Sequence, residues 1–429
     1  MKSVVRIQRQ GKGKDVSLSA PATLPATDAI DTKVALIQAL IPLGLHAVAE
    51  ALAAEVVALA GERYRREGGR PDVVRWGHQR GSVYLADQKL PITVPRVRDR
   101  SVNMELPLRT YARLQVPRAA DAGLFRKVLV GLSCRQYAAC AEAVPAAFGL
   151  SAASVSRRFI RASARHLQAL CERRLDRDEF VALVLDGKTF TDDAMVIALG
   201  VTLHGQKKVL GFVQTATENE RVCATFLREL VARGLRVEPG LLCVIDGAKG
   251  LRKALQTVFG GQALVQRCQW HKRENVVQYL PKSQHAAWRQ RLQQAYEHPT
   301  YAEARAALGQ IRRELRDVNL SAVASLEEGL EETLTLHRLG LFPALGVSLK
   351  TTNCLESLHA QLGQLTDKVD YWRTSEQKHR WVASALLTIE PRLRRIKGYR
   401  HLPLLRAALH AEIGRAESKQ GVHQGVHVA

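Results

Sequence analysis

Two apolar runs, each followed at once by Asp-Gly, constrain the fold of this 429-residue chain more than any other feature. Residues 180–185 are continuously apolar and lead into Asp186, and residues 241–245 lead in the same way into Asp246. An apolar run of this length is typical of a strand that is buried on both faces. We therefore predict a buried sheet with an Asp at the C-terminal end of each of these two strands.

The residues between and after these runs predict the rest of an α/β core. Residues 194–203 and 209–215 read as two more strands, so the first three strands form an antiparallel meander. A helix is expected from about residue 217 to Gly234, which is the residue type that commonly ends a helix. From His271 to about Gly346 the pattern is helical throughout, and no strand is predicted there.

Asp186 and Asp246 are the first candidate site residues. A carboxylate at the C-terminal end of a strand emerges at the sheet edge where ligands of α/β folds collect. If the two strands are neighbours, the carboxylates converge and repel each other unless a divalent cation lies between them. The alternative is that each Asp-Gly is only a turn, because the dipeptide is common in turns.

Three further polar residues each have a structural alternative to a role in a site. Glu356 stands three residues after Asn353, so it could be the Glu of a capping box. Cys268 and His271 form a C-x-x-H pair that could help to bind zinc. A structural zinc site needs four ligands, however, and no second pair has ligand spacing, which favours a buried thiol and a hydrogen-bonded imidazole.

Charge indicates a polyanionic partner. The chain carries 63 Lys and Arg against 41 acids, a formal charge of +22 and a pI near 10.0. Such an excess favours nucleic-acid binding, with an ordinary basic or ribosome-associated protein as the alternative. A Gly-containing turn followed by an arginine-rich helix resembles a helix-turn-helix, and its alternative is a solvated helix face. The predicted DNA-binding residues are Arg157, Arg158, Arg161 and Arg165 on that helix, and Lys249 and Arg252 after Asp246.

The composition predicts a cytoplasmic protein. No apolar run is expected to approach the roughly 18 residues needed to cross a bilayer, so no membrane partner is predicted. The basic N-terminus is not followed by the apolar segment of a secretory signal. The seven cysteines are scattered, with no CxxC pair, which is typical of free thiols in a reducing compartment.

The organisation predicted from these patterns runs through seven segments. They are a flexible basic arm (1–30), a helical and small β-containing subdomain (31–110), a helical DNA-binding region (111–178), the first part of the core (179–270), an all-helical insertion (271–346), the last core helix with a basic stretch (347–400) and a C-terminal tail (401–429).

The order of these features resembles one known family, the Mutator-like insertion-sequence transposases of bacteria. The motifs that carry the resemblance are VIDGAKGLRKA at 244–254, QRCQWHK at 266–272, GLEETL at 329–334 and TTNCLE at 351–356. The likeness covers about residues 110 to 405 and is weaker before that. Many relatives have Arg directly after the final Glu, whereas this chain has Ser357, which puts a phosphate contact at that position in doubt.

The resemblance implies an RNase H-like catalytic core, interrupted by an all-helical insertion and preceded by a mainly helical DNA-binding region. It also implies a DDE-type enzyme in which Asp186, Asp246 and Glu356 are catalytic and hold two Mg²⁺ or Mn²⁺ ions. Cys268, His271 and Asn353 are implied to support the active site. The implied DNA partner is double-stranded DNA, both at the ends of the element and at the target. At least one further copy of the chain is also expected as a partner. When bound to DNA, the protein would lie at the bacterial nucleoid.

Two other functions remain open on the sequence alone. One is a DNA-binding relative whose core is catalytically idle. The other is a different RNase H-like nuclease, such as a junction resolvase, which the long helical insertion and the basic N-terminal half disfavour. A structural metal-binding protein is a more distant alternative.

Overall fold

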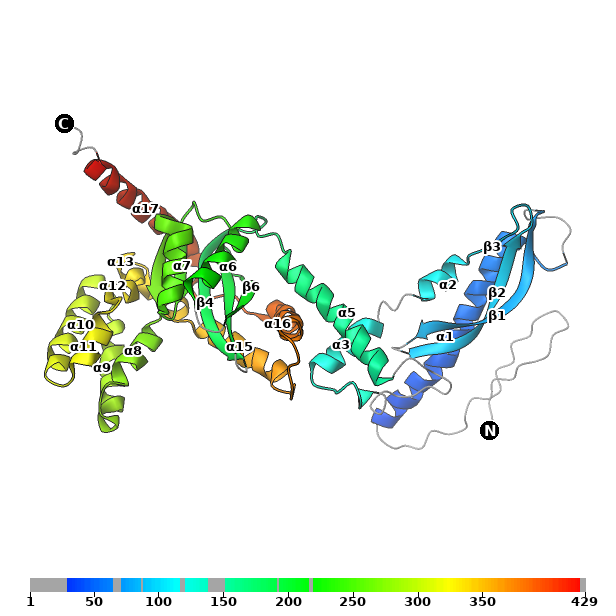
Figure 1. Ribbon diagram of the computed structural model, residues 1–429, viewed down its shortest axis with the longest axis horizontal. Coiled ribbons are helices and arrows are strands. Elements are labelled where there is room, and N and C mark those ends of the chain that lie inside the picture. Colours follow the sequence, from blue (N-terminus) through cyan, green and yellow to red (C-terminus); the bar gives the residue numbers. More distant parts are fainter. Residues whose placement is uncertain are drawn as a thin grey trace. The chain divides into compact units, whose positions relative to one another are not determined.

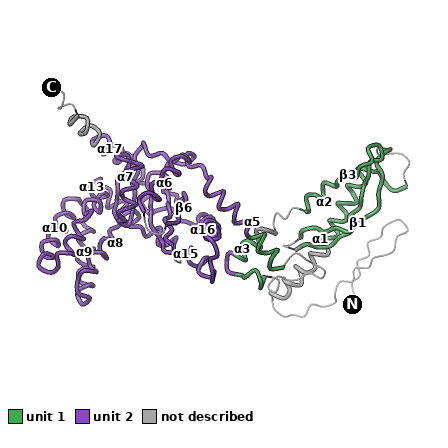
Figure 2. The backbone as a smooth tube through the Cα atoms, viewed as in Figure 1, with its two compact units in different colours: residues 1–128, 132–159 green, residues 129–131, 160–429 purple. Residues whose placement is uncertain are grey.

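The computed structural model describes residues 29–64, 71–85, 88–115, 120–137, 151–190, 193–215 and 219–424 (Figure 1). Contacts between Cα atoms divide the chain into two compact units (Figure 2). Unit 1 comprises residues 1–128 and 132–159, and unit 2 comprises residues 129–131 and 160–429. The boundary falls inside a helix, whereas the sequence predicted a division at residue 178.

Unit 1 consists of a long helix on one face of a three-stranded antiparallel sheet. The helix is α1 (Ala29–Ala60), and the strands are β1 (Val73–Leu85), β2 (Gln88–Asp99) and β3 (Met104–Leu106), in the order β1-β2-β3. The remaining helices are α2 (Arg109–Leu114), α3 (Ala120–Leu129) and the first part of α5 (Ala152–Cys171). Helix α1 and these three strands lie largely within residues 31–110, where helices and short strands were predicted. The basic arm and the turn before α5 lie outside the described residues.

One stretch of α1 differs from the sequence expectation. Leu43–Ala60 is long and apolar enough to cross a membrane by length and composition alone, so the expectation that no run approaches that length is wrong. Val48, Leu52 and Val56 of this stretch are buried in the core that α1 shares with the strands. One face of the helix is thus used to cover the sheet.

Unit 2 is built around a five-stranded mixed sheet in the order β6-β5-β4-β7-β8. Strands β4 (Phe180–Phe190), β5 (Asp193–Thr202) and β6 (Lys207–Thr215) form the predicted antiparallel meander, and β7 (Leu241–Ile245) lies parallel to β4. Strand β8 (Ala263–Arg267), parallel to β7, was not predicted. The strand that contains Asp186 also continues to Phe190, so the prediction that Asp186 ends it is wrong.

Helices cover both faces of this sheet, because alternate strand residues enter different cores. Ala182 and Val184 point into a core shared with α15 (Asn353–Thr366), α16 (Ser375–Ile389) and α17 (Leu402–Gln424). Leu183 and Leu185 point into a second core, shared with α6 (Glu220–Ala232) and α7 (Lys249–Phe259). The result is a helix–sheet–helix arrangement, which follows from strands that are apolar on both sides.

Between β8 and α15, where an all-helical insertion was predicted, the chain forms helices that have a hydrophobic core of their own. Its helices are α8 (Gln269–Val277), α9 (His285–Tyr296), α10 (Tyr301–Arg316), α11 (Leu320–Glu327), α12 (Leu330–Thr333), α13 (Thr335–Arg338) and α14 (Phe342–Leu349). The predicted C-terminal tail is instead largely the helix α17. Its Leu402, Leu405 and Leu409 are buried in the core of the sheet, because they recur at helical spacing.

Candidate active site

Asp186 and Asp246 lie at equivalent positions on neighbouring parallel strands. Leu185 of β4 is paired with Ile245 of β7, and each Asp is the next residue along its chain. Adjacent strands are about 4.8 Å apart, so the two backbones are close at this point. Asp186 continues the alternation of Ala182 and Val184 and therefore faces the side of the sheet that α15 covers. The expectation that the two strands are neighbours is confirmed.

Asp246 also forms the Asp-Gly turn that the sequence analysis gave as the alternative to a role in a metal site. Its Oδ1 accepts a hydrogen bond of 3.0 Å from the backbone N–H of Ala248, and Gly247 adopts a φ of +115°. A side chain at Gly247 would also collide with the guanidinium of Arg267. The turn fixes one carboxylate oxygen of Asp246 at the end of β7.

Glu356 is in the first turn of α15 and does not act as a capping-box residue. The N-cap of α15 is Thr352, not Asn353, and its side chain makes no capping hydrogen bond. The Oε1 atom of Glu356 is buried and has no hydrogen-bond partner among the described residues. A buried carboxylate oxygen without a partner is costly, and a bound cation is one way to remove that cost.

A hydrogen bond and an electrostatic effect link α15 to β4. Lys188, two residues after Asp186, donates a 2.8 Å hydrogen bond from Nζ to the backbone oxygen of His359. Burial, with a smaller contribution from the charge of Asp186, raises the pKa of the Cys354 thiol to about 11. The strand that carries Asp186 and the helix that carries Glu356 are therefore in contact at the site.

The C-x-x-H pair links three elements at this site. Cys268 is the N-cap of α8, its N–H donates to Ile245 O at 2.7 Å, and its Sγ accepts from the N–H of His271 at 3.5 Å. The hydroxyl of Thr352 donates to the Cys268 sulfur at 3.7 Å and lies 3.5 Å from Nδ1 of His271. The end of β7 is thereby held to α8 and to the beginning of α15. Cys268 is thus a buried thiol with hydrogen-bond partners in α8 and at the beginning of α15.

The carboxylates are within electrostatic reach of His271. Burial lowers the pKa of this imidazole, but the hydrogen bond and charge of Cys268 and the charges of Asp186 and Asp246 raise it to about 9. Asn353 lies further out, on a pocket of about 300 Å³ that Trp270, Arg273 and other residues of α8 and α9 also line.

Sequence reasoning missed two buried cations that join the core to the insertion. Arg267 is 7% exposed and donates to Gly247 O at 2.5 Å and to Glu328 O at 2.8 Å. Lys272 donates to Ser325 O at 2.7 Å and to Glu328 O at 2.6 Å, and burial lowers its pKa to about 8. The only indication in the sequence that these two residues matter was their position within the QRCQWHK motif. Arg267 ties the turn after Asp246 to the helical insertion.

The predicted DNA-binding residues differ in exposure. Arg157, Arg161 and Arg165 are exposed along α5, as a contact surface requires. Arg158 is only 8% exposed and stacks over the ring of Tyr84, which leaves it little area for DNA. Arg252 is ion-paired with Glu332 at 2.7 Å. Lys249 lies 4.0 Å from Glu328 and stays largely exposed.

The chemistry of the three acids suits a metal ion. Within the described residues, no group of three or more His, Cys, Asp or Glu side chains is close enough together to hold a metal ion. The donor set nevertheless fits a hard divalent cation, which prefers carboxylate oxygens. The partnerless oxygen of Glu356 supports the same fit.

These features define an α/β protein with two carboxylates on adjacent parallel strands and a third on a covering helix. The chain belongs to the Mutator family of transposases, whose family model matches residues 20–390.

Several insertion-sequence transposases are similar to this chain. That of ISRM5 from Rhizobium meliloti (strain 1021) is 29% identical over 312 residues, which are 70% of this chain and 75% of the relative. That of IS256 in Tn4001 from Staphylococcus aureus is 23% identical over 317 residues, 70% of this chain and 77% of the relative. That of IST2 from Acidithiobacillus ferrooxidans is 32% identical over 177 residues, 41% of this chain and 57% of the relative.

Proposed function

We propose that this protein is the transposase of an insertion sequence, a DDE-type enzyme with an RNase H-like core that cuts and rejoins DNA. The observation that carries the proposal is the placement of Asp186 and Asp246 side by side on parallel strands, on the face that the Glu356 helix covers. The unpartnered buried oxygen of Glu356 adds to it. Family membership supports transposition as the biological role.

Asp186, Asp246 and Glu356 would hold two Mg²⁺ or Mn²⁺ ions. Such ions, when bound, make a water or hydroxyl a stronger nucleophile and stabilise the charge on the leaving oxygen. Three carboxylates leave room for phosphate oxygens of DNA, because small hard cations in such sites keep positions for water and substrate. The reaction would begin with attack of water on a phosphodiester at the element end, which releases a 3′-OH. That hydroxyl would then attack a second phosphodiester and join the strands.

The other residues of the site would position these carboxylates. Cys268, His271 and Thr352 connect the end of β7 to the beginning of α15. Lys188 connects α15 to β4. Rigid connections of this kind keep catalytic groups at the productive separation when DNA binds. Asn353 lines the neighbouring pocket and would contact a phosphate of the bound DNA.

The test incubates the purified protein with labelled duplex that carries the element's own ends, in Mg²⁺ or in EDTA. We expect Mg²⁺-dependent nicking and end-joining, and we expect Glu356→Gln, Asp186→Ala and Asp246→Ala to lose at least 100-fold of the cleavage rate while DNA binding persists. A loss of two to three orders of magnitude is typical when transition-state charge is left unbalanced. Tight binding by the wild type without cleavage, in Mg²⁺ and in Mn²⁺, would favour the catalytically idle relative instead.

A further inference from the structure

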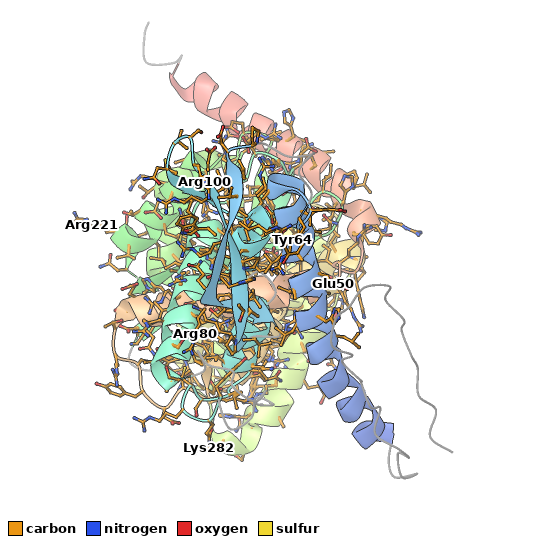
Figure 3. All side chains as sticks on the ribbon, turned by 90° about the vertical axis from the view of Figure 1, so that its right-hand side faces the viewer. Glu50, Tyr64, Arg80, Arg100, Arg221 and Lys282 are labelled. Carbon is orange, nitrogen blue, oxygen red and sulfur yellow. The ribbon has the colours of Figure 1, made fainter. Side chains whose placement is uncertain are left out.

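The helical insertion contains a pocket beside the candidate active site. The turn that joins α8 to α9 carries Lys282 (Figure 3). The pocket, of about 300 Å³, lies at the other end of these two helices, where α8 begins, α9 ends and the chain enters α15. Its main lining residues are Gln269, Trp270, Arg273, Tyr296, Lys350 and Asn353.

The chain connects this pocket closely to the three acids. Cys268, directly before Gln269, donates its N–H to the backbone oxygen of Ile245 at 2.7 Å, at the end of β7. Asn353 precedes Glu356 by three residues on α15, which is less than one helical turn of about 5.4 Å. A DNA strand with one phosphate at the acids would therefore have a neighbouring nucleotide at the pocket.

Trp270 provides an open aromatic surface at this pocket. The residue is 41% exposed, although it lies in the well-packed insertion. Among the described residues no cation is stacked over its ring, in contrast to Trp288, which has the guanidinium of Arg291 at 4.5 Å. The indole of Trp270 thus keeps area on which a planar ring can stack.

The polar groups of the pocket favour an uncharged ligand. Arg273 is ion-paired with Glu274 at 3.1 Å. Lys350 is ion-paired with Glu297 at 2.5 Å, so both cations of the lining already have an acid as partner. Gln269 is only 4% exposed, and its Oε1 has no hydrogen-bond partner among the described residues. An N–H group of a ligand would give this oxygen a partner and remove the cost of a buried unpaired acceptor.

We infer that this pocket receives one nucleobase of the element-end DNA, turned out of the duplex next to the bond that is cut. The inference rests on the proposed function, since it takes DNA as the substrate. A nucleobase has a flat π surface, N–H donors and no charge, which are the properties that the pocket requires. Ligand pockets span about 300–1,000 Å³, and a pocket at the small end of that range suits a single ring system. Stacking on Trp270 would offset part of the cost of taking the base out of the duplex.

The experiment measures the affinity of the full-length protein for element-end duplexes, in the Glu356→Gln background so that no DNA is cut. One set of duplexes lacks a single base, at each position next to the cleaved bond in turn. Trp270→Ala removes the stacking surface, whereas Trp270→Phe keeps an aromatic ring. The matched control Tyr279→Ala removes an aromatic residue that is 46% exposed, in the turn after α8 and outside the pocket lining. Circular dichroism melts check that all variants are folded.

We expect Trp270→Ala to bind the intact duplex roughly 10-fold more weakly than its parent, because the base loses its aromatic partner. On the one duplex that lacks the received base, the two proteins should bind within about 2-fold of each other, since the interaction between ring and base is already gone. Trp270→Phe and Tyr279→Ala should bind the intact duplex like the parent.

A loss of affinity that is equal on every duplex would overturn the inference, because the ring would then contact the DNA backbone or a second copy of the chain. Unchanged binding by Trp270→Ala would overturn it as well. If the wild type cuts the ends while no missing base abolishes the effect of Trp270→Ala, the pocket assignment fails and the proposed reaction stands. If one missing base does abolish it but the wild type does not cut, the proposed reaction fails and the pocket assignment stands.

Discussion

His359, one turn after Glu356, makes the stability of the core depend on pH. The imidazole is 9% exposed, and burial, together with the nearby charge of Lys188, lowers its pKa to about 4. In the unfolded chain the pKa returns to about 6.5. As pH falls from 6.5 to 4, the unfolded chain therefore binds a proton that the folded chain does not, and stability is lost through that window.

We expect unit 2 to lose roughly 2 kcal/mol of unfolding free energy between pH 7 and pH 5 from this residue alone. The variant His359→Gln removes the titration and should flatten the dependence by that amount. Urea unfolding at both pH values measures it. His401→Gln, at an exposed histidine, should keep the wild-type dependence, whereas an unchanged dependence in the His359 variant would contradict the assignment.

The sequence could identify the acids of the site but not the residues that hold them. Asp186 and Asp246 follow apolar runs, and Glu356 lies in the TTNCLE motif, so each has a local signature. The role of Arg267 depends on Glu328, 61 residues away in the chain, and no local pattern reports such a pairing. Arg158 shows the reverse error, because a charged residue in a run was expected to be exposed and is buried against Tyr84.

At the scale of elements, Arg267 connects the turn after β7 to the helical insertion. Its guanidinium donates to the backbone oxygens of Gly247 and Glu328, and it lies 3.6 Å from the Glu328 carboxylate. Gly247 and Gly329 both have positive φ, and a side chain at either would collide with this arginine. The insertion is thereby fixed to the loop that positions Asp246.

We expect R267M to destabilise unit 2 by about 3–5 kcal/mol, because it leaves buried polar groups without their partner. Cleavage should fall more than DNA binding, since the turn at Asp246 loses its support. The control R305M removes an arginine from an exposed ion pair with Glu331 and should leave the free energy of unfolding nearly unchanged, because solvent screens such a pair. Chemical unfolding compares the two, and similar losses would show that Arg267 does not act as this connection.

The exposed arginines of α5 give a prediction for that helix. Arg157, Arg161 and Arg165 stand at intervals of four residues and are all exposed, so they lie along one side of the helix. We expect their joint replacement by Gln to lower the salt slope of DNA binding by about 2.7, or roughly 0.9 for each lost phosphate contact. Replacement by Lys should preserve the slope. A slope that is unchanged in the Gln variant would exclude α5 as a DNA contact.

The sequence predicted element types better than element ends and pairings. The apolar runs of β4 and β7 correctly predicted the two central strands of the sheet, because strands that are buried on both faces need such runs. Strand β8 is as short as β7, but it was missed because it ends in the polar residues Gln266 and Arg267 and so lacks a continuous apolar run. Its position is set by parallel pairing with β7, which is a long-range contact.

At the scale of the whole molecule, the proposed function requires action at two DNA ends. The chain has one copy each of Asp186, Asp246 and Glu356, whereas excision of an element requires action at both of its ends. Two copies of the chain, related by symmetry, would place one site at each end. We therefore expect the complex with element-end DNA to contain at least two copies of the chain and two duplexes.

This prediction can be measured on the Glu356→Gln variant, which should bind the ends without cutting them. Light scattering gives the mass of the complex, and two duplexes that carry different fluorophores should be recovered together when one of them is captured. A duplex of the same length without the element end serves as the control and should not be captured in pairs. The prediction would be contradicted if the complex had the mass of one chain and one duplex while the wild type still joined the ends.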